Sequence, residues 1–339
     1  QLLTYRFSRS YLIMLKIGVH THDSQVVVAP MAGVTDLPFR NLCRSFGSHW
    51  LVSEMLSSDR RLWSSQKSSY RNRFDGEAGL RWVQIAGADP DMMADAARDI
   101  ASRGAHIVDI NMGCPAKKVC RKAAGSALLR DESLVARILS RVVAAVRVPV
   151  TLKIRLGWSY DEVNAVRVAK IAENEGIAAL TVHGRTRDCR FLGEVNYHLI
   201  GEVKSQVSIP VIANGDIDSI DKARDVISLT GADALMVGRA ALGQPWLPAE
   251  IDAGLKSGIP ATCLLFEEKL TVMQEHIRLL VEFYGETAGH RIARKHVGWF
   301  LQEHYVDSRL LRQQFNALEN STYQVEFIAS ARSLQLKVA

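Results

Sequence analysis

The sequence VDINMGCPAKK, residues 108–118, joins a short apolar run to a Gly-Cys-Pro turn and two lysines. The run at 107–110 is typical of a buried strand, so the turn places the thiol of Cys114 at the end of that strand. Asp109 and Asn111 are two residues apart and therefore share one face of the strand. Because polar groups on a buried strand need partners, this face predicts either a structural hydrogen-bond network or a functional site.

Similar apolar runs recur along the chain and alternate with helix-like segments. The runs lie at 26–29, 50–53, 80–85, 107–111, 148–154, 179–183, 211–214 and 234–237, and helical patterns fall between them, for example at 91–103, 133–146, 162–175 and 221–229. A step of about 30 residues between eight strands is what an α/β fold with a (β/α)8 TIM barrel requires. A doubly wound sheet is the alternative, but the early GxGxxG turn that would bind a nucleotide there is missing from the sequence.

The alternation stops after Trp246, and the segment KSGIP at 256–260 marks a boundary. Apolar residues then follow at steps of four and three, which predicts an amphipathic helix; they are Phe266, Leu270, Met273, Ile277 and Leu280. We expect Gly285 and Gly289 to interrupt the pattern before a second helix, with further helices from Ser308 and Thr322. The predicted organisation is an N-terminal extension at 1–14, a TIM barrel at 15–255 and a small all-helical domain at 256–339.

Composition narrows the class of protein. The chain has 339 residues and a net charge of +6, which fits either a merely basic surface or a polyanionic partner. Its five cysteines are scattered and show no metal-ligand spacing, so we expect free thiols, a reducing compartment and no bound metal. No apolar run reaches the roughly 18 residues that a membrane span needs, which favours a cytoplasmic protein without membrane contact.

Polar residues gather where the predicted strands end, which is where TIM barrels carry their chemistry. Thr151, Lys153 and Arg155 share one face of the fifth strand and direct two cations into the barrel mouth. Two inward cations predict an anionic ligand, because burying them without anions is costly. An internal salt bridge is the alternative for Lys153. His183, at the end of the sixth strand, is either a satisfied core residue or part of this cationic cluster.

Glycines follow the seventh and eighth strands in the segments Asn214-Gly215-Asp216 and Gly238-Arg239. Glycine lets backbone N–H groups approach a phosphate, and TIM barrels commonly hold a phosphate at this position. The sequence therefore predicts a phosphorylated cofactor.

The second C-terminal helix carries a dense basic cluster beside an aromatic residue, composed of His290, Arg291, Arg294, Lys295 and His296. Two interpretations stay open for it: a solvated helix face, and a face that contacts nucleic-acid phosphates.

Six segments resemble those of the tRNA-dihydrouridine synthases, with closest similarity to the bacterial DusB branch. They lie at 29–35, 109–118, 152–155, 181–186, 212–217 and 236–240, and the resemblance extends from about Lys16 to the C-terminal helices. It implies an oxidoreductase that uses FMN and NADPH to reduce the C5–C6 double bond of a D-loop uridine in tRNA. The DusB-like similarity suggests position 17. We expect a monomer, and the NADPH docking site stays open.

The resemblance also implies roles for individual residues. The residues that match the flavin-binding positions are Pro30, Met31, Ala32, Gln84, Lys153, Asn214, Gly215, Asp216, Gly238 and Arg239, with His183 beside them. Cys114 matches the residue that gives a proton to C5 of uracil while reduced FMN gives hydride to C6. A thiol with a pKa near 8.5 is mostly protonated at neutral pH, which suits an acid. A thiolate nucleophile is the alternative, and the extra thiol of Cys120 has no assigned role.

Substrate contacts are expected from two places. Asn111, Arg155 and Arg185 would face the uracil, and Arg291, Arg294 and Lys295 would face tRNA phosphates. Two other functions stay open at this point: an FMN barrel that reduces a free small molecule, such as dihydroorotate or an enoate, and a tRNA-binding protein without catalysis. Activity on free uridine would support the first, and the absence of flavin would support the second.

Overall fold

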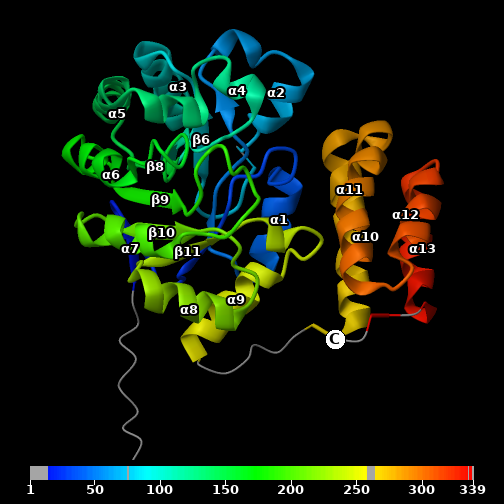
Figure 1. Ribbon diagram of the computed structural model, residues 1–339. Helices are drawn as coiled ribbons and strands as arrows, with labels where there is room; N and C mark the ends of the chain where they lie inside the picture. The colour runs from blue at the N-terminus through cyan, green and yellow to red at the C-terminus, as the bar shows by residue number, and fades with distance from the viewer. Residues whose placement is uncertain (1–13, 75, 258–263, 335, 338–339) are drawn as a thin grey trace, which may run out of the picture.

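The computed structural model describes residues 14–74, 76–257, 264–334 and 336–337, shown in Figure 1. Most of the predicted extension at 1–14 and the segment 258–263 lie outside these residues. The predicted boundary between 255 and 256 falls in the last turn of helix α9 (Leu247–Ser257).

The predicted TIM barrel is confirmed. The parallel strands are β3 (Val26–Val28), β4 (Trp50–Leu51), β5 (Leu56–Ser57), β6 (Trp82–Ala86), β7 (Ile107–Met112), β8 (Val150–Arg155), β9 (Ala179–His183), β10 (Val211–Asn214) and β11 (Ala234–Val237), and their order in the sheet is β4-β3-β11-β10-β9-β8-β7-β6-β5. β4 and β5 are two halves of the second barrel strand. A parallel bridge from Val52 to Trp82 lies between them and closes the barrel.

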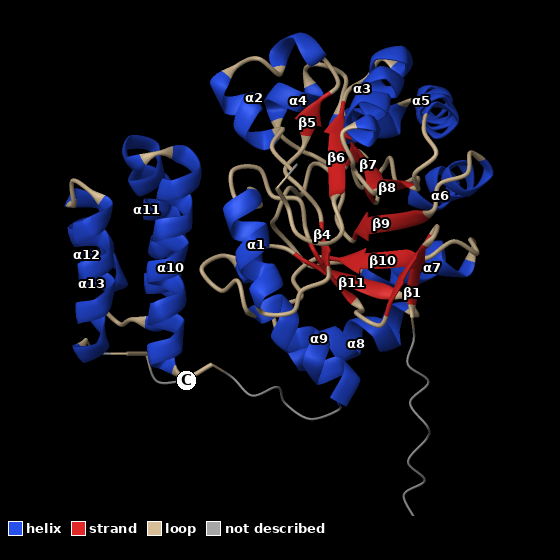
Figure 2. Cartoon of the chain, turned by 180° about the vertical axis from the view of Figure 1, so that it is seen from behind, coloured by secondary structure: helices blue, strands red, loops and turns tan. Residues whose placement is uncertain are grey.

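Helices cover the outside of the barrel, as Figures 1 and 2 show. They are α1 (Leu37–Ser45), α2 (Gln66–Arg71), α3 (Pro90–Ser102), α5 (Glu132–Ala145), α6 (Ala165–Asn174), α7 (Tyr197–Ser205), α8 (Ile220–Thr230) and α9. The short helix α4 (Lys117–Cys120) lies instead at the carboxyl end of β7. Every residue of β7 and β8 is buried, because a barrel strand faces helices on one side and the barrel interior on the other. This two-sided burial is why the strands appear in the sequence as nearly continuous apolar runs.

A short hairpin closes the end of the barrel where the strands begin. Its strands are β1 (Leu15–Ile17) and β2 (His20–His22), paired antiparallel. Leu15 and Ile17 are buried in one cluster with Trp50, Trp82 and Ile107. The amino end of the barrel is therefore filled with apolar side chains, and the opposite end is left for a site.

The chain ends in a group of four helices beside the barrel, at the left in Figure 2. These are α10 (Phe266–Tyr284), α11 (Glu286–His304), α12 (Ser308–Ala317) and α13 (Ser321–Ser330). The predicted apolar face of α10 is buried at Leu270, Met273, Ile277 and Leu280. The prediction that Gly289 interrupts a helix is wrong. Gly289 lies inside α11, where an added Cβ would come within 2.5 Å of the Val281 Cα, so its small size permits close packing of α10 on α11.

The helical region docks on the β3–α1 segment and on α1. The Tyr284 hydroxyl donates to the Asp36 carboxylate at 2.9 Å, and the Phe39 ring lies 5.8 Å from that of His276 and 5.9 Å from that of His296. Gly243, with φ of +73°, approaches α11 so closely that a Cβ would lie 2.4 Å from the Phe300 nitrogen. These contacts fix one edge of the helical region next to the carboxyl ends of the strands.

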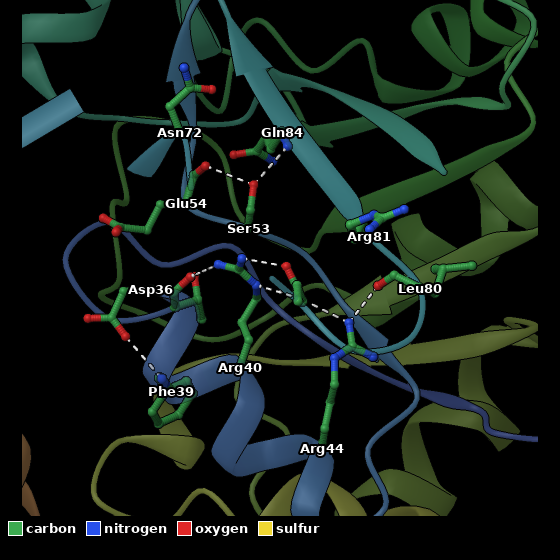
Figure 3. A network of polar contacts seen from close by, with 12 residues as sticks. Asp36, Phe39, Arg40, Arg44, Ser53, Glu54, Asn72, Leu80, Arg81 and Gln84 are labelled. Atoms are coloured by element: carbon green, nitrogen blue, oxygen red, sulfur yellow. Dashed lines mark hydrogen bonds and ion pairs between the residues drawn. The ribbon is translucent and has the colours of Figure 1, made fainter. Parts of the chain in front are cut away.

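Figure 3 shows a buried ionic network on α1 and, separate from it, the hydrogen bonds of the kink between β4 and β5. Arg40 and Arg44 of α1 both donate to the carboxylate of Glu77, which is 5% exposed. In the kink itself, the Ser53 hydroxyl donates to the Glu54 carbonyl and accepts from the backbone N–H of Gln84. The position of Gln84 inside the barrel is set by these contacts.

Candidate active site

A cavity of about 1140 Å³ lies at the carboxyl ends of the barrel strands. It is lined by all the residues predicted to bind the flavin, and by Cys114, Asn111 and Arg155: the flavin set is Pro30, Met31, Ala32, Gln84, Lys153, His183, Asn214, Gly215, Asp216, Gly238 and Arg239. Parallel strands bring their carboxyl ends together, which explains how positions more than 200 residues apart in sequence share one wall.

Polar side chains in the barrel interior form one continuous hydrogen-bond chain below the cavity. The Trp82 indole donates to the Thr151 hydroxyl at 2.9 Å, and Thr151 donates to Asp109 at 2.6 Å. Gln84 donates through Nε2 to the other Asp109 oxygen at 2.6 Å, and Asn111 donates through Nδ2 to Gln84 Oε1 at 2.8 Å. Of the two possibilities for the polar face of this strand, the hydrogen-bond network is thus present, and it ends at the cavity.

The carboxyl group at the centre of this chain has an unusual proton affinity. Burial raises the pKa of Asp109 to about 6, although the hydrogen bonds from Gln84 and Thr151 act in the opposite direction. Asp109 is only 2% exposed, so its charge is compensated mainly by those two donors.

The free end of the chain positions the loop that carries the thiol. Asn111 Oδ1 accepts from the backbone N–H of Cys114 at 3.0 Å and from that of Gly113 at 3.3 Å. Burial raises the pKa of the Cys114 thiol above its ordinary value, while a hydrogen bond from Ala116 and the charges of Arg155 and Lys153 lower it. The net direction favours the protonated thiol at neutral pH. The predicted acid is therefore electrostatically reasonable.

The extra thiol lies against the same loop. Cys120 directs its sulfur to the Cys114 carbonyl oxygen at 3.6 Å, and that oxygen also accepts from the Ser126 N–H. Its contact is with the backbone of the loop.

Lys153 and His183 both face the cavity and differ in their charge near neutral pH. Lys153 donates to Asn214 Oδ1 at 2.9 Å, and burial, with the neighbouring Arg155, lowers its pKa to about 8. Asn214 in turn donates to the Met236 carbonyl, which fixes the amide orientation. Burial strongly lowers the pKa of His183, and the surrounding cations lower it further. Near pH 7 the site thus contains a lysine that is mostly charged and a neutral imidazole.

Two arginines converge on Asp216 at the far wall. Arg185 donates to both carboxylate oxygens, and Arg239 donates to one of them at 2.5 Å. The hydrogen bonds from Arg185 lower the Asp216 pKa, so the carboxylate stays ionised at neutral pH. Asp216 has φ of +45°, directly after Gly215, and this turn is what places its side chain between the arginines.

Arg155 and Arg185 point to backbone carbonyls as well as to the site. Arg155 is 1% exposed and donates to the carbonyls of Gly113, Thr186 and Arg190 at 3.0, 2.8 and 2.7 Å. Arg185 lies outside the cavity lining and donates to the carbonyls of Leu192 and Gly193. Their guanidinium groups therefore hold the loop between β9 and α7 in place.

The three predicted tRNA contacts of α11 do not line the cavity. Arg291 is exposed, Arg294 donates to the Leu318 carbonyl at 3.3 Å, and Lys295 donates to the Gly33 carbonyl of the β3–α1 segment. The histidines of the predicted basic cluster are not part of a solvated face. His290 and His296 are buried, and burial lowers the pKa of His296 well below its ordinary value.

Sequence reasoning missed several residues that line the cavity, among them Arg190, Phe191, Gln244 and Glu303. Phe191 had a visible signal, an apolar residue in a predicted loop. Glu303 had none, because it reaches the cavity from α11, whose docking on the barrel is not readable from the sequence.

The described residues contain no group of three or more His, Cys, Asp or Glu side chains that could hold a metal ion. In the same part of the chain no helix is both long and apolar enough to cross a membrane.

Comparisons with known proteins find similar sequences over almost the whole chain. The model of the dihydrouridine synthase (Dus) family matches residues 27–336. The tRNA-dihydrouridine synthase B of Pseudomonas aeruginosa is 56% identical over 311 residues, which are 92% of this chain and 93% of that protein. The tRNA-dihydrouridine synthase B of Proteus vulgaris is 55% identical over 92% of this chain and 96% of that protein.

Among solved structures, an old yellow enzyme homologue from Zymomonas mobilis is similar with a TM-score of 0.52 and 16% identity, over 76% of this chain and 96% of that chain. At this identity the likeness concerns the barrel fold alone.

Proposed function

This chain belongs to the dihydrouridine synthase family, and from that premise we propose that it reduces a uridine of tRNA to dihydrouridine. The observation that carries the proposal is the position of Cys114. Its thiol lies at the wall of a large cavity that also contains a buried lysine, and its loop is held by Asn111. A thiol in this setting can give a proton to a carbon atom of a substrate base.

The donor set of the cavity fits FMN. Lys153 offers a cation in the interior, where negative charge on a reduced flavin ring would need one. Gly215 and Gly238 line the wall where TIM barrels commonly hold a phosphate, and Arg239 lies beside them with its side chain 49% exposed. Pro30, Met31, Ala32, Gln84, Asn214, Asp216 and His183 would complete the contacts. Bound FMN, reduced by NADPH, would supply the reducing equivalents.

Cys114 is proposed as the proton donor to C5 of the uracil. Burial keeps its thiol protonated near neutral pH, so the group arrives at the reaction with the proton it has to give. Asn111 positions the loop by accepting both backbone N–H groups. Its side chain is engaged on both sides, and in this proposal it acts on the substrate through Cys114.

The helical region is proposed to hold the tRNA body. Arg291 is exposed, and cationic side chains supply the salt-dependent part of nucleic-acid binding. Arg294 and Lys295 already bind backbone carbonyls, so we expect them to add charge to this face while they also tie α11 to its neighbours. A D-loop uridine, at position 17 in the proposal, would then reach the cavity in a monomeric, cytoplasmic enzyme.

The test compares Cys114→Ala with Cys120→Ala. We expect purified wild-type protein to be yellow, and tRNA from cells with Cys120→Ala to keep its dihydrouridine. The Cys114→Ala form should bind flavin but lose dihydrouridine at one D-loop position in mass spectrometry of tRNA fragments. Full modification by Cys114→Ala would remove the thiol from the mechanism. A wild-type protein that modifies no tRNA but reduces a free enoate or orotate would instead support the small-molecule alternative.

A further inference from the structure

The loop between β9 and α7 exposes two apolar side chains at the edge of the cavity. We call residues 187–193 the rim loop. Phe191 is 49% exposed and also lines the cavity, and Leu192 is 78% exposed. Tyr160, 71% exposed, lies nearby, with its hydroxyl 3.9 Å from where a Cβ on Gly193 would be. A group of exposed large apolar side chains beside a cavity marks a binding surface.

The rim loop is held rigidly from below. The buried Arg155 binds its Arg190 carbonyl, and the buried Arg185 binds the carbonyls of Leu192 at 3.1 Å and of Gly193 at 2.6 Å. Two residues have a left-handed backbone, Arg190 with φ of +52° and Gly193 with φ of +70°. A backbone held this way presents Phe191 and Leu192 outward at little further entropic cost on binding.

Cations surround the apolar tip. The Phe191 ring has the guanidinium of Arg239 at 4.9 Å from its centroid and that of Arg155 at 5.4 Å. The side chain of Arg190 is exposed beside it. Aromatic and apolar surfaces interleaved with cations are the pattern by which proteins hold single-stranded nucleic acid, with bases on the apolar surfaces and phosphates on the cations.

We propose that Phe191 and Leu192 form a platform for the nucleobase next to the target uridine. Arg190 would face the phosphate that joins this neighbouring nucleotide to the target uridine. The inference rests on the proposed function and goes beyond it. A uracil that enters the cavity near Cys114 must turn out of the base stack while its backbone stays at the cavity edge. The rim loop lies at that edge. The platform would make the enzyme bind RNA more tightly than free uridine, because free uridine has no neighbouring base.

The test uses Leu192→Ala, since this side chain is exposed and does not line the cavity. Leu229→Ala is the matched control, because Leu229 is 51% exposed on α8 and belongs to no proposed site. Affinity is measured for a series of transcripts, each lacking one base of the D-loop. Phe191→Tyr, which keeps the ring, should behave as wild type, and Phe191→Ala should behave as Leu192→Ala.

For wild type, we expect one missing base to weaken binding roughly 5- to 150-fold, the range that base stacking on an aromatic side chain contributes. Leu192→Ala should lose part of this factor with the intact transcript, because Phe191 remains, and it should bind the transcript without that base as tightly as wild type does. Equal affinities of Leu192→Ala and Leu229→Ala for the intact transcript would overturn the platform.

Dihydrouridine formation is measured on the same transcripts. The base that matters for affinity should adjoin the uridine that wild type modifies, and a sensitive base elsewhere would overturn the platform. If wild type forms no dihydrouridine, the proposed function falls, while the affinities still decide whether the rim loop binds a base.

Discussion

Replacing Gln84 by Glu would place a second carboxyl group against Asp109 with almost no change in side-chain size. In the wild-type protein Gln84 is 1% exposed and donates to Asp109 at 2.6 Å. Two carboxylates at this distance in a buried site cannot both be ionised. We therefore expect folded Gln84→Glu protein to hold one proton that its unfolded chain releases near neutral pH.

The loss in the free energy of unfolding can be calculated from this one bound proton. A free Glu has a pKa of about 4.3, so holding the proton at pH 7 costs about 3.7 kcal/mol, from about 2.7 pH units at about 1.36 kcal/mol each. Because the folded state binds the extra proton, the free energy of unfolding falls as the pH rises. Asp109 in the wild type has a pKa of about 6 and adds little slope above that pH. The difference between variant and wild type should thus grow by about 2.7 kcal/mol from pH 6.5 to pH 8.5.

The assay is urea denaturation of both proteins at pH 6.5, 7.5 and 8.5. Gln206→Glu serves as the control, because Gln206 is exposed and its carboxylate would ionise freely in both states. A difference between Gln84→Glu and wild type that stays constant across the three pH values would refute the reasoning. It would mean that the new carboxyl group escapes from Asp109 or reaches water.

Other predictions test the cavity wall and the interface with the helical region. Because the pKa of Lys153 is about 8, FMN affinity should fall as the pH rises through that value, and Lys153→Met should remove both this pH dependence and most of the affinity in a fluorescence titration. Asn111→Ala removes the acceptor that holds the thiol loop and should slow single-turnover dihydrouridine formation about 100-fold while tRNA affinity is retained; an unchanged rate would show that the loop needs no such support. Gly243→Ala should lower the free energy of unfolding by about 2–4 kcal/mol, from backbone strain and overlap with α11, and clearly more than Gly231→Ala, whose φ is similar but whose surroundings are open; equal losses would contradict the close approach.

The barrel was predictable because its physics is local and repetitive. Parallel strands buried on both sides give continuous apolar runs, and every run located in the sequence overlaps a strand of the structure, although the second barrel strand is divided and continues beyond its run at 50–53 as β5. The division depends on the contacts of Ser53 with Gln84, which join segments 31 residues apart. No pattern near Ser53 reports such a contact.

The cavity lining was predictable for a different reason. Residues at the carboxyl ends of barrel strands converge whatever their distance in sequence, so placing the strands was enough to place Cys114 and Lys153 together. The direction of long side chains was not predictable. Arg155 and Arg185 were expected to face the uracil, which stays a prediction; Arg155 lines the cavity, and both side chains also bind loop carbonyls, contacts that depend on the loop conformation. The buried and exposed faces of helix α11 were also not predictable, because tertiary packing against the barrel decides that His296 is buried and Arg291 is exposed.

The way the two buried arginines hold the rim loop has a consequence for how such an enzyme can diversify. Arg155 and Arg185 donate their hydrogen bonds to main-chain oxygens, which every amino acid carries, and they donate none to the side chains of Phe191 and Leu192. We therefore expect the side chains at 191 and 192 to be replaceable by mutation while the backbone of the rim loop keeps its conformation. Arg155 also holds the Gly113 carbonyl next to the thiol, so one buried side chain supports both the rim loop and the loop of Cys114. Accordingly, we expect exchanges of rim-loop side chains to change which neighbouring nucleotide is accepted while the backbone of the loop is retained.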